Sequence, residues 1–405
     1  MGDNEGATTS VSMAYNLRSR VSEQERLNIE SMYQAFVTGD MEAARNEHRI
    51  WAQLYAHDSI PPGRLANIDL TMGQYEEAII EYRTALSLDP DNGMQYVNLA
   101  NAYTFINRPD QTEAALRDAE ARHVNPAAID DILYCAAFLR HDAGAMDNIA
   151  SRLLKQPNYE DQILNFESDS AAYTGHLGQG RELSEAAIAS AEHEGEKELA
   201  AGYAAESALR DALAGNSEIA KLQARRALSM SDVSQVEAVA AIALALAGEA
   251  AQSEQVAADL SKRFPLNTAV QFNYLPVIKT AAVLSKDATK ALQAIAPAQR
   301  YELGWMGNNL DFNGYPVYFR AEALLATHQG AVAAAEFQKI IDHPGVVLNE
   351  PIAALARLGL GRSYAMSGDR EKAKNAYQDF LSLWKNADPD TPIYKQAKAE
   401  YANLR

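Results

Sequence analysis

Apolar positions along the chain recur at a long, regular interval rather than alternating with polar ones. The recurring pairs, all with the same spacing of 34 positions, are Leu65 with Leu99, Ala66 with Ala100, and Ala85 with Ala119. No four-residue stretch alternates cleanly between turn clusters, so strand signals are nearly absent. The pattern predicts an all-helical chain made of repeated units, each long enough for one pair of antiparallel helices.

A second pattern lies within each unit: a turn residue, an alanine five positions later and an aromatic residue nine positions later. Gly73, Ala78 and Tyr82 form a complete copy of this pattern. Other copies, some incomplete, are Gly368 with Ala373 and Tyr377, His328 with Ala333 and Phe337, Gly39 with Ala44, and Gly215 with Ala220. We interpret the turn residue as the end of the first helix, the alanine as the point where two helices approach closely, and the aromatic as filler between hairpins.

Helix-start signals agree with this interpretation. Ser22 with Glu25 forms the sequence of a capping box, Asp110 follows Pro109, and Asp369 opens a polar first turn. From residue 22 onward, a spacing of roughly 34 to 40 residues predicts a solenoid of about ten antiparallel hairpins. We expect residues 1–21 to be a polar segment with a partial helix, residues 22–405 to form the solenoid, and the clearest repeats to cover 59–126 and 316–389.

Length and composition indicate a repeat array and exclude some classes of partner. At 405 residues the chain exceeds the roughly 250 to 300 residues that one hydrophobic core supports, which favours a repeat array. A net charge of -18 repels phosphate backbones, so nucleic acid is not an expected partner. No apolar run reaches the roughly 18 residues that cross a bilayer, so we expect a soluble chain that does not insert into membranes.

Several short motifs suggest catalytic or metal-binding chemistry, but chance or structure explains each of them better. His48-Arg49-Ile50 and Asp311 to Gly314 echo kinase motifs but lack the lysine-bearing strand and the glycine-rich loop. The acidic run Glu192 to Glu198 is interpreted as a solvated loop, and Cys135 as a core residue. We therefore expect no enzyme activity, no catalytic residue, no metal and no cofactor.

Residues 65–90 and 360–389 resemble the tetratricopeptide repeat (TPR) family in their small, aromatic and proline positions. A narrower resemblance, to the C-terminal repeat region of acidobacterial serine/threonine protein kinases and related signalling regulators, rests on residues 21–30 (VSEQERLNIE), 264–276 (FPLNTAVQFNYLP), 343–351 (HPGVVLNEP) and 383–401 (LWKNADPDTPIYKQAKAEY). The resemblance implies a TPR-like superhelix that is the sensory or partner-binding part of a bacterial signalling protein. It implies a kinase or winged-helix domain in cis or in trans, and a cytoplasmic location, or the far side of a membrane if the parent is anchored there.

In such a solenoid the first helix of each hairpin lines the concave face. Asn67 and Asn101 follow the small alanine of that helix in adjacent copies, and two carboxamides one repeat apart can hold the backbone of an extended peptide. The alternative is that both face water or cap a turn. Tyr318, Glu322 and Arg362 occupy corresponding positions near the C-terminus, either for a polar ligand or as an intramolecular Glu322 to Arg362 pair.

These observations predict a non-catalytic protein-interaction or sensor module. The alternative is an architectural or oligomerisation solenoid without a ligand groove. Because the chain is acidic, we expect a basic peptide or protein as partner. The aromatic loop around Trp305 and Phe312 either offers a second, apolar contact or seals the end of a hairpin.

Overall fold

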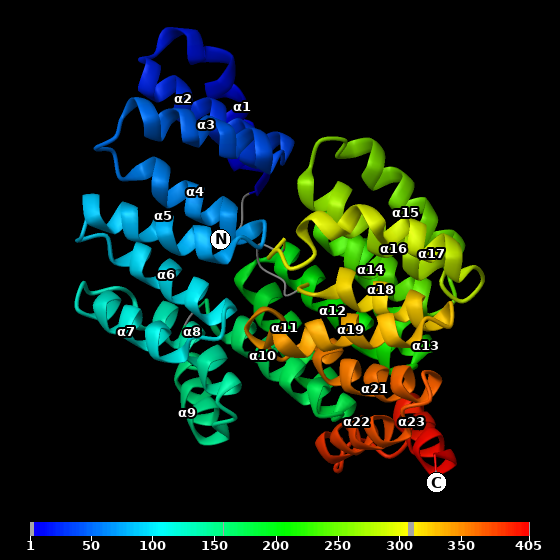
Figure 1. The fold of residues 1–405 in the computed structure, drawn as a ribbon. Helices are drawn as coiled ribbons and strands as arrows, with labels where there is room; N and C mark the ends of the chain where they lie inside the picture. Colours follow the sequence, from blue (N-terminus) through cyan, green and yellow to red (C-terminus); the bar gives the residue numbers. More distant parts are fainter. Residues whose placement is uncertain (1–3, 157, 307–311, 405) are drawn as a thin grey trace. The chain divides into compact units, whose positions relative to one another are not determined.

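A computed structural model describes residues 4–156, 158–306 and 312–404 (Figure 1). In this described part all regular structure is helical and no strand occurs. The expected all-α fold, an array of antiparallel helical hairpins, is therefore confirmed. None of these helices combines the length and the apolar character that a membrane span requires.

The first four hairpins follow an N-terminal helix, α1 (Asn4–Leu17), and a short 3₁₀ turn (Arg18–Arg20). The first helix of the first hairpin, α2, ends in a π-helical turn, Gln34–Thr38. The hairpins are α2 (Glu23–Tyr33) with α3 (Met41–Leu54), α4 (Ile60–Thr71) with α5 (Tyr75–Leu88), α6 (Gly93–Phe105) with α7 (Pro109–Glu120), and α8 (Pro126–Leu139) with α9 (Ala143–Leu153).

Six further hairpins follow. They are α10 (Glu160–Tyr173) with α11 (Leu177–Glu194), α12 (Lys197–Ala214) with α13 (Ser217–Met230), α14 (Ser234–Leu246) with α15 (Ala250–Arg263), α16 (Leu275–Val283) with α17 (Ala288–Ile295), α18 (Tyr315–Ala326) with α19 (Gly330–Asp342), and α21 (Pro351–Met366) with α22 (Arg370–Leu383). A π-helical turn (Val270–Tyr274) precedes α16 and a 3₁₀ turn (Ala296–Tyr301) follows α17. The short α20 (Pro344–Val347) and the terminal α23 (Pro392–Asn403) complete the described elements.

Local chemistry accounts for where these helices begin and end. The predicted capping box is present, because Ser22 Oγ accepts from Glu25 N and Ser22 N donates to Glu25 Oε2. Five successive first helices end at left-handed residues spaced by 34 positions: Gly39, Gly73, Asn107, His141 and Gly175. Three are glycines, which adopt positive φ without strain, and the other two are residue types that tolerate it better than most.

The alanines of the repeat pattern explain how closely the paired helices pack. Ala44, Ala78, Ala220, Ala333 and Ala373 each have no exposed surface. Tyr82, Phe337 and Tyr377, the aromatic residues of the same pattern, are also buried. The predicted roles of these residues in packing are therefore confirmed.

The chain forms two compact units, and neither is a single continuous segment. The N-terminal unit consists of Met1–Ala150 with Phe264–Gln271 and Leu303–Met306, and the C-terminal unit contains the other residues. In the N-terminal unit, Thr268 N donates to Gly39 O at 2.9 Å, and Tyr75 Oη donates to Leu303 O. Two late segments thus complete the unit that the early hairpins begin, a division that the repeat pattern did not indicate.

Candidate functional site

One repeated position on the first helices is polar or small in four successive hairpins. It holds Asn67 in α4, Asn101 in α6, Cys135 in α8 and Asp169 in α10, each 34 positions after the last. Asn67 is exposed and Asn101 is half-buried, whereas Asp169 is only 3% exposed. The position is therefore accessible on α4 and α6, where the sequence predicts the peptide-binding asparagines.

Tyr82 of α5 holds one end of the Asn67 carboxamide. Its hydroxyl donates to Asn67 Oδ1 at 2.6 Å. Burial raises the pKa of Tyr82 above its ordinary value, so the hydroxyl remains a donor at neutral pH. Asn67 Nδ2 makes no hydrogen bond to a described residue, which leaves its two N–H groups for a ligand carbonyl.

Asn101 lacks this support. The residue 34 positions after Tyr82 is Leu116, which is buried and has no hydroxyl. Within the part of the chain that the structure describes, the Asn101 side chain makes no hydrogen bond, so both its amide and its carbonyl can pair with a peptide backbone. The role of Tyr82 in positioning Asn67 was missed, because the sequence pattern assigns that aromatic residue only to packing.

A buried ion pair joins the first two hairpins. Arg45 Nε of α3 is 2.7 Å from Asp69 Oδ1 of α4, and Arg45 also donates to Gln74 Oε1. Burial raises the pKa of Asp69 to about 6, and the positive charge of Arg45 opposes that rise. The pair joins the first hairpin to the second and so fixes the helix that carries Asn67.

Negative charge is concentrated in the same part of the chain. Residues 1–150 contain 23 Asp and Glu residues, 11 arginines and no lysine, a net charge of -12 out of the -18 of the whole chain. An acidic surface of this kind attracts cationic ligands over distances of about a Debye length.

The C-terminal candidates form a network with a residue that the sequence did not suggest. Arg362 of α21 donates from Nε to Glu400 Oε2 at 2.9 Å and from Nη2 to Glu400 Oε1 at 3.1 Å. Tyr377 Oη also donates to Glu400 Oε2, at 3.0 Å. Burial raises the pKa of Glu322, while Arg362 and a hydrogen bond from Tyr318 lower it. The structure brings Tyr318, Glu322 and Arg362 together, but Glu400 already occupies the guanidinium group of Arg362.

The aromatic loop divides between the two units. Trp305 packs against Phe105 in the N-terminal unit, with ring centroids 5.8 Å apart. Phe312 belongs to the C-terminal unit, where it is fully buried and stacks on Tyr315 at 4.3 Å. Residues 307–311 of the predicted loop lie outside the described residues. Phe312 is therefore a core residue of its unit.

Comparison with known protein families gives one match. Residues 66–104, which include Asn67, Asn101 and the whole of α5, match the family described as TPR repeat. These residues are similar to a TPR repeat. No curated protein sequence matches the chain.

Two solved structures align with nearly the full length of the chain, at low identity. The crystal structure of yeast Tom70 is 13% identical, with 94% of this chain and 95% of that chain covered and a TM-score of 0.36. The P58(IPK) TPR domain is 12% identical, with 95% and 97% covered and a TM-score of 0.26. Likeness at this level says nothing about the partners of the present chain.

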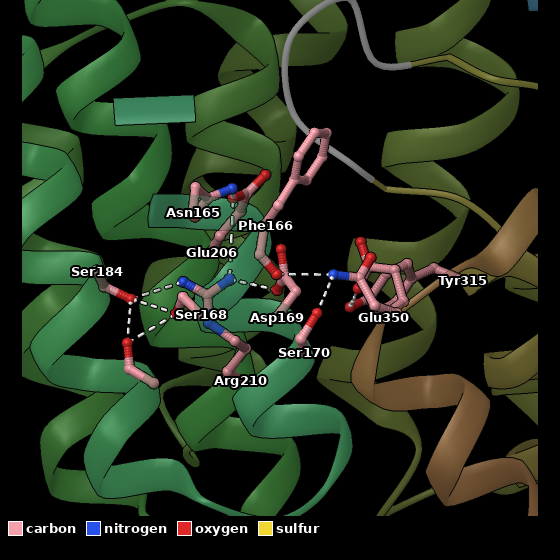
Figure 2. A network of polar contacts seen from close by, with 12 residues as sticks. Asn165, Phe166, Ser168, Asp169, Ser170, Ser184, Glu206, Arg210, Tyr315 and Glu350 are labelled. Atoms are coloured by element: carbon pink, nitrogen blue, oxygen red, sulfur yellow. Dashed lines mark hydrogen bonds and ion pairs between the residues drawn. The ribbon is translucent and has the colours of Figure 1, made fainter. Parts of the chain in front are cut away.

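In the C-terminal unit, the first helices of two hairpins, α10 and α12, carry buried charges (Figure 2). Arg210 of α12 lies between Asp169 and Ser184: Nη1 donates to Asp169 Oδ1 at 2.5 Å and Nη2 donates to Ser184 Oγ at 2.8 Å. Glu206, one turn earlier, accepts from Asn165 Nδ2 at 2.7 Å. Burial raises the pKa of Asp169, and Arg210 opposes that rise.

Residues from the last hairpins extend this network. Asn349 Nδ2 donates to Phe166 O at 2.8 Å and to Ser170 Oγ at 3.0 Å. Tyr315 Oη donates to Glu350 Oε2 at 2.7 Å. Asp169, which holds the position of the accessible asparagines, is buried and bound to Arg210, so α10 does not present this position to a ligand.

A signal for this network was present in the sequence but was not used. Five and nine positions after Gly175, the expected alanine and aromatic are Gly180 and Ser184. Ser168 and Ser184 both donate to Gly180 O, at 2.7 and 2.8 Å. The missing aromatic leaves room for the guanidinium group of Arg210, which is 5% exposed.

Proposed function

We propose that this protein is a non-catalytic interaction module whose N-terminal unit binds an extended, basic peptide segment through Asn67 and Asn101. The observation that supports this proposal is the exposure of Asn67 with its carboxamide held by Tyr82, one repeat away from Asn101. A carboxamide that is already oriented loses less entropy when it binds, and two of them pair with backbone groups whatever the peptide sequence.

The charge of the N-terminal unit supports a basic ligand. With a net charge of -12 in residues 1–150, the field favours peptides rich in lysine and arginine and disfavours acidic ones. The resemblance to the repeat regions of acidobacterial serine/threonine kinases supports a place in bacterial signalling, with a kinase or winged-helix domain in cis or in trans as the associated partner.

Peptide binding to the full chain tests the proposal. We expect a basic peptide pool to bind more tightly than an acidic pool, and the difference to shrink between about 50 and 300 mM salt because exposed charges are screened. Changing both Asn67 and Asn101 to Ala should weaken binding at least about tenfold, which is about 1.4 kcal/mol. Tyr82→Phe should give a smaller loss, since it removes only the support of Asn67.

The matched control is Asn46→Ala, an exposed asparagine on the second helix of the first hairpin. It should bind as the wild type does. Wild-type affinity in the double variant would show that the two asparagines are not the binding site. Equal binding of the basic and acidic pools at both salt concentrations would contradict the expected preference for a basic peptide.

The buried network favours a second function for the other unit. Because Asp169, Glu206 and Arg210 are turned inward and bonded to one another, the C-terminal unit is better suited to an architectural role than to holding a peptide. Arg362→Ala should then leave peptide affinity unchanged, although loss of its two bonds to Glu400 lowers stability.

A further inference from the structure

The segment after α22 lies against a hairpin from a much earlier part of the C-terminal unit. Trp384, which is 1% exposed, donates from Nε1 to Tyr173 O at 3.0 Å. Asp388 N donates to Gly175 O, also at 3.0 Å. Asp388 Oδ2 accepts from Gly178 N at 2.7 Å. The last hairpin is thus joined to the turn between α10 and α11.

These bonds satisfy groups that the two helices cannot satisfy themselves. Tyr173 is the last residue of α10 and Gly175 forms its turn, so their carbonyls have no partner further along the helix. Gly178 lies in the first turn of α11, where an amide N–H likewise needs an external acceptor. A carboxylate at a helix N-terminus also interacts favourably with the helix dipole. Asp388 therefore acts as a helix cap supplied from a distant part of the chain.

The turn also permits close approach. Gly175 has φ +85°, and a Cβ at that position would lie 2.5 Å from Ala387 Cβ and 2.8 Å from Trp384 Cδ2. The segment buries Trp384, Ala387 and Thr391 and exposes Lys385, Asn386, Pro389 and Asp390. One face of the segment therefore lies against the unit while the other faces solvent.

Apolar contacts accompany the polar ones but pack incompletely. Ile393 packs against a cluster of Ala172, Leu177 and Ala214. A cavity of about 10 Å³ remains at the contact, with room for at most one water molecule. Its lining includes Ala172, Leu177, Arg210, Leu355 and Trp384. Trp384 of the docked segment therefore faces the same cavity as Arg210.

The N-terminal unit uses the same chemistry at another turn. Thr268 N donates to Gly39 O at 2.9 Å, and Thr268 Oγ1 accepts from Met41 N at 3.0 Å. In both units a residue with a side-chain oxygen binds the turn carbonyl through its own N–H and caps the following helix. The left-handed glycine turn is thus a docking point that two unrelated segments of this chain occupy.

We propose that residues 384–393, hereafter the clasp, are a displaceable strap that closes the C-terminal unit beside Arg210, and that their release opens the unit between α10 and the last hairpin. The clasp docks at one turn through three hydrogen bonds, and Ile393 adds contacts with one small apolar cluster. Trp384 also packs against Phe380 of α22, with ring centroids 4.9 Å apart, so the start of the clasp is anchored on the last hairpin. This inference concerns the C-terminal unit and does not depend on peptide binding at Asn67 and Asn101.

Hydrogen exchange of the full chain tests the clasp. Asp388→Ala should speed exchange at least about tenfold across residues 161–178 and 203–214, beyond the single amide of Gly178 that loses its acceptor. The control is Asp390→Ala, in the same segment, which removes only an exposed ion pair with Lys395. It should exchange as the wild type does. Asp388→Asn, which keeps a weaker acceptor, provides an intermediate variant if Asp388→Ala is poorly folded.

A synthetic peptide of residues 381–395 separates a displaceable strap from an ordinary part of the core. Added in excess to Asp388→Ala protein, it should restore slow exchange in a saturable way, and the same peptide carrying Asp388→Ala should not. The proposal is wrong if faster exchange in Asp388→Ala protein is confined to Gly178, or if the wild-type peptide has no effect on that protein.

Discussion

His48 is a buried titratable group of α3 in the N-terminal unit. It is 2% exposed and stacks on Trp51 with ring centroids 6.0 Å apart. Burial, with a smaller contribution from the positive charge of Arg64, lowers the pKa of His48 to about 4. The folded protein therefore holds this imidazole neutral at a pH where the unfolded chain, with an ordinary pKa near 6.5, protonates it.

We predict that this histidine makes the N-terminal unit less stable in acid. Because the folded pKa is below the unfolded one, the stability that neutral His48 contributes is complete above about pH 6.5 and is lost as the pH falls towards 4. Between pH 7 and 5 the free energy of unfolding should fall by about 2 kcal/mol more in the wild type than in His48→Gln. Urea unfolding at both pH values measures this, with His57→Gln, an exposed histidine, as control. Parallel pH profiles for wild type and His48→Gln would contradict the assignment.

Sequence reasoning at the residue scale succeeded for packing and failed for buried charge. Ala78 and Ala373 could be placed at helix contacts because a small side chain at a fixed interval has one main explanation. Arg210 could not be placed, because a charged residue is normally exposed and its partner Asp169 lies on another helix in an earlier hairpin. The peptide-binding role of Asn67 and Asn101 stays a prediction, as does any ligand role of Tyr318, Glu322 and Arg362.

At the scale of the element, turn glycines differ in what surrounds them. Gly73 and Gly248 both have positive φ, at +79° and +93°. A Cβ on Gly73 would lie 2.9 Å from the backbone nitrogen of Gly304, whereas a Cβ on Gly248 would have no neighbour within 4 Å. The two positions therefore separate the cost of the backbone conformation from the cost of a docked segment.

We predict that Gly248→Ala costs about 1 to 2 kcal/mol in the free energy of unfolding, since an alanine is strained in the left-handed region. Gly73→Ala should cost at least about 1 kcal/mol more, because it also forces the segment Leu303–Met306 away from the turn. Denaturant midpoints of both variants, at unchanged slope, give the comparison. Equal losses would mean that residues 303–306 contribute nothing at this turn.

The pattern of elements could be predicted because it repeats. About ten hairpins follow from the interval between small residues, and ten are present in the described chain. Asn107 and His141 were missed as turns because the pattern pairs a glycine with a later alanine, while Thr112 and Met146 stand at the alanine position. The regular interval that separates Gly39 from Gly73, continued along the chain, leads to both residues.

At the scale of the whole molecule, the division into two units has a consequence for unfolding. Each unit buries its own core, so we predict two separable transitions in denaturant. Ala44→Leu should lower the stability of the N-terminal unit alone, and Ala373→Leu that of the C-terminal unit alone. Each should do so by about 1 to 3 kcal/mol, because extra methylenes are forced between packed helices. Hydrogen exchange in urea assigns each loss to its unit, with Ala114→Leu on an exposed position as control. A loss shared by both units would show that they unfold together.

The division of the chain into two units could not be predicted from the sequence. A repeat pattern reports contacts between neighbouring hairpins, and the segments that complete the N-terminal unit pair with residues from the opposite end of the sequence, as Thr268 does with Met41. Neither Thr268 nor Leu303 is a turn residue, an alanine or an aromatic residue of the repeat pattern. Their contribution is visible only when the chain is folded.

The interrupted N-terminal unit also sets a delay during synthesis. Between Ala150 and Met306 the ribosome adds 156 residues, which takes roughly 8 to 30 s at translation rates of about 5 to 20 residues per second. The carbonyl of Gly39 and the amide of Met41 have no partner until Thr268 is synthesised, and the turn at Gly73 lacks its neighbour until Leu303 follows. Nascent chains on one messenger carry the same open turns and, later, the same late segments. Exchange of these segments between neighbouring nascent chains is therefore a route to misassembly that the interrupted unit opens.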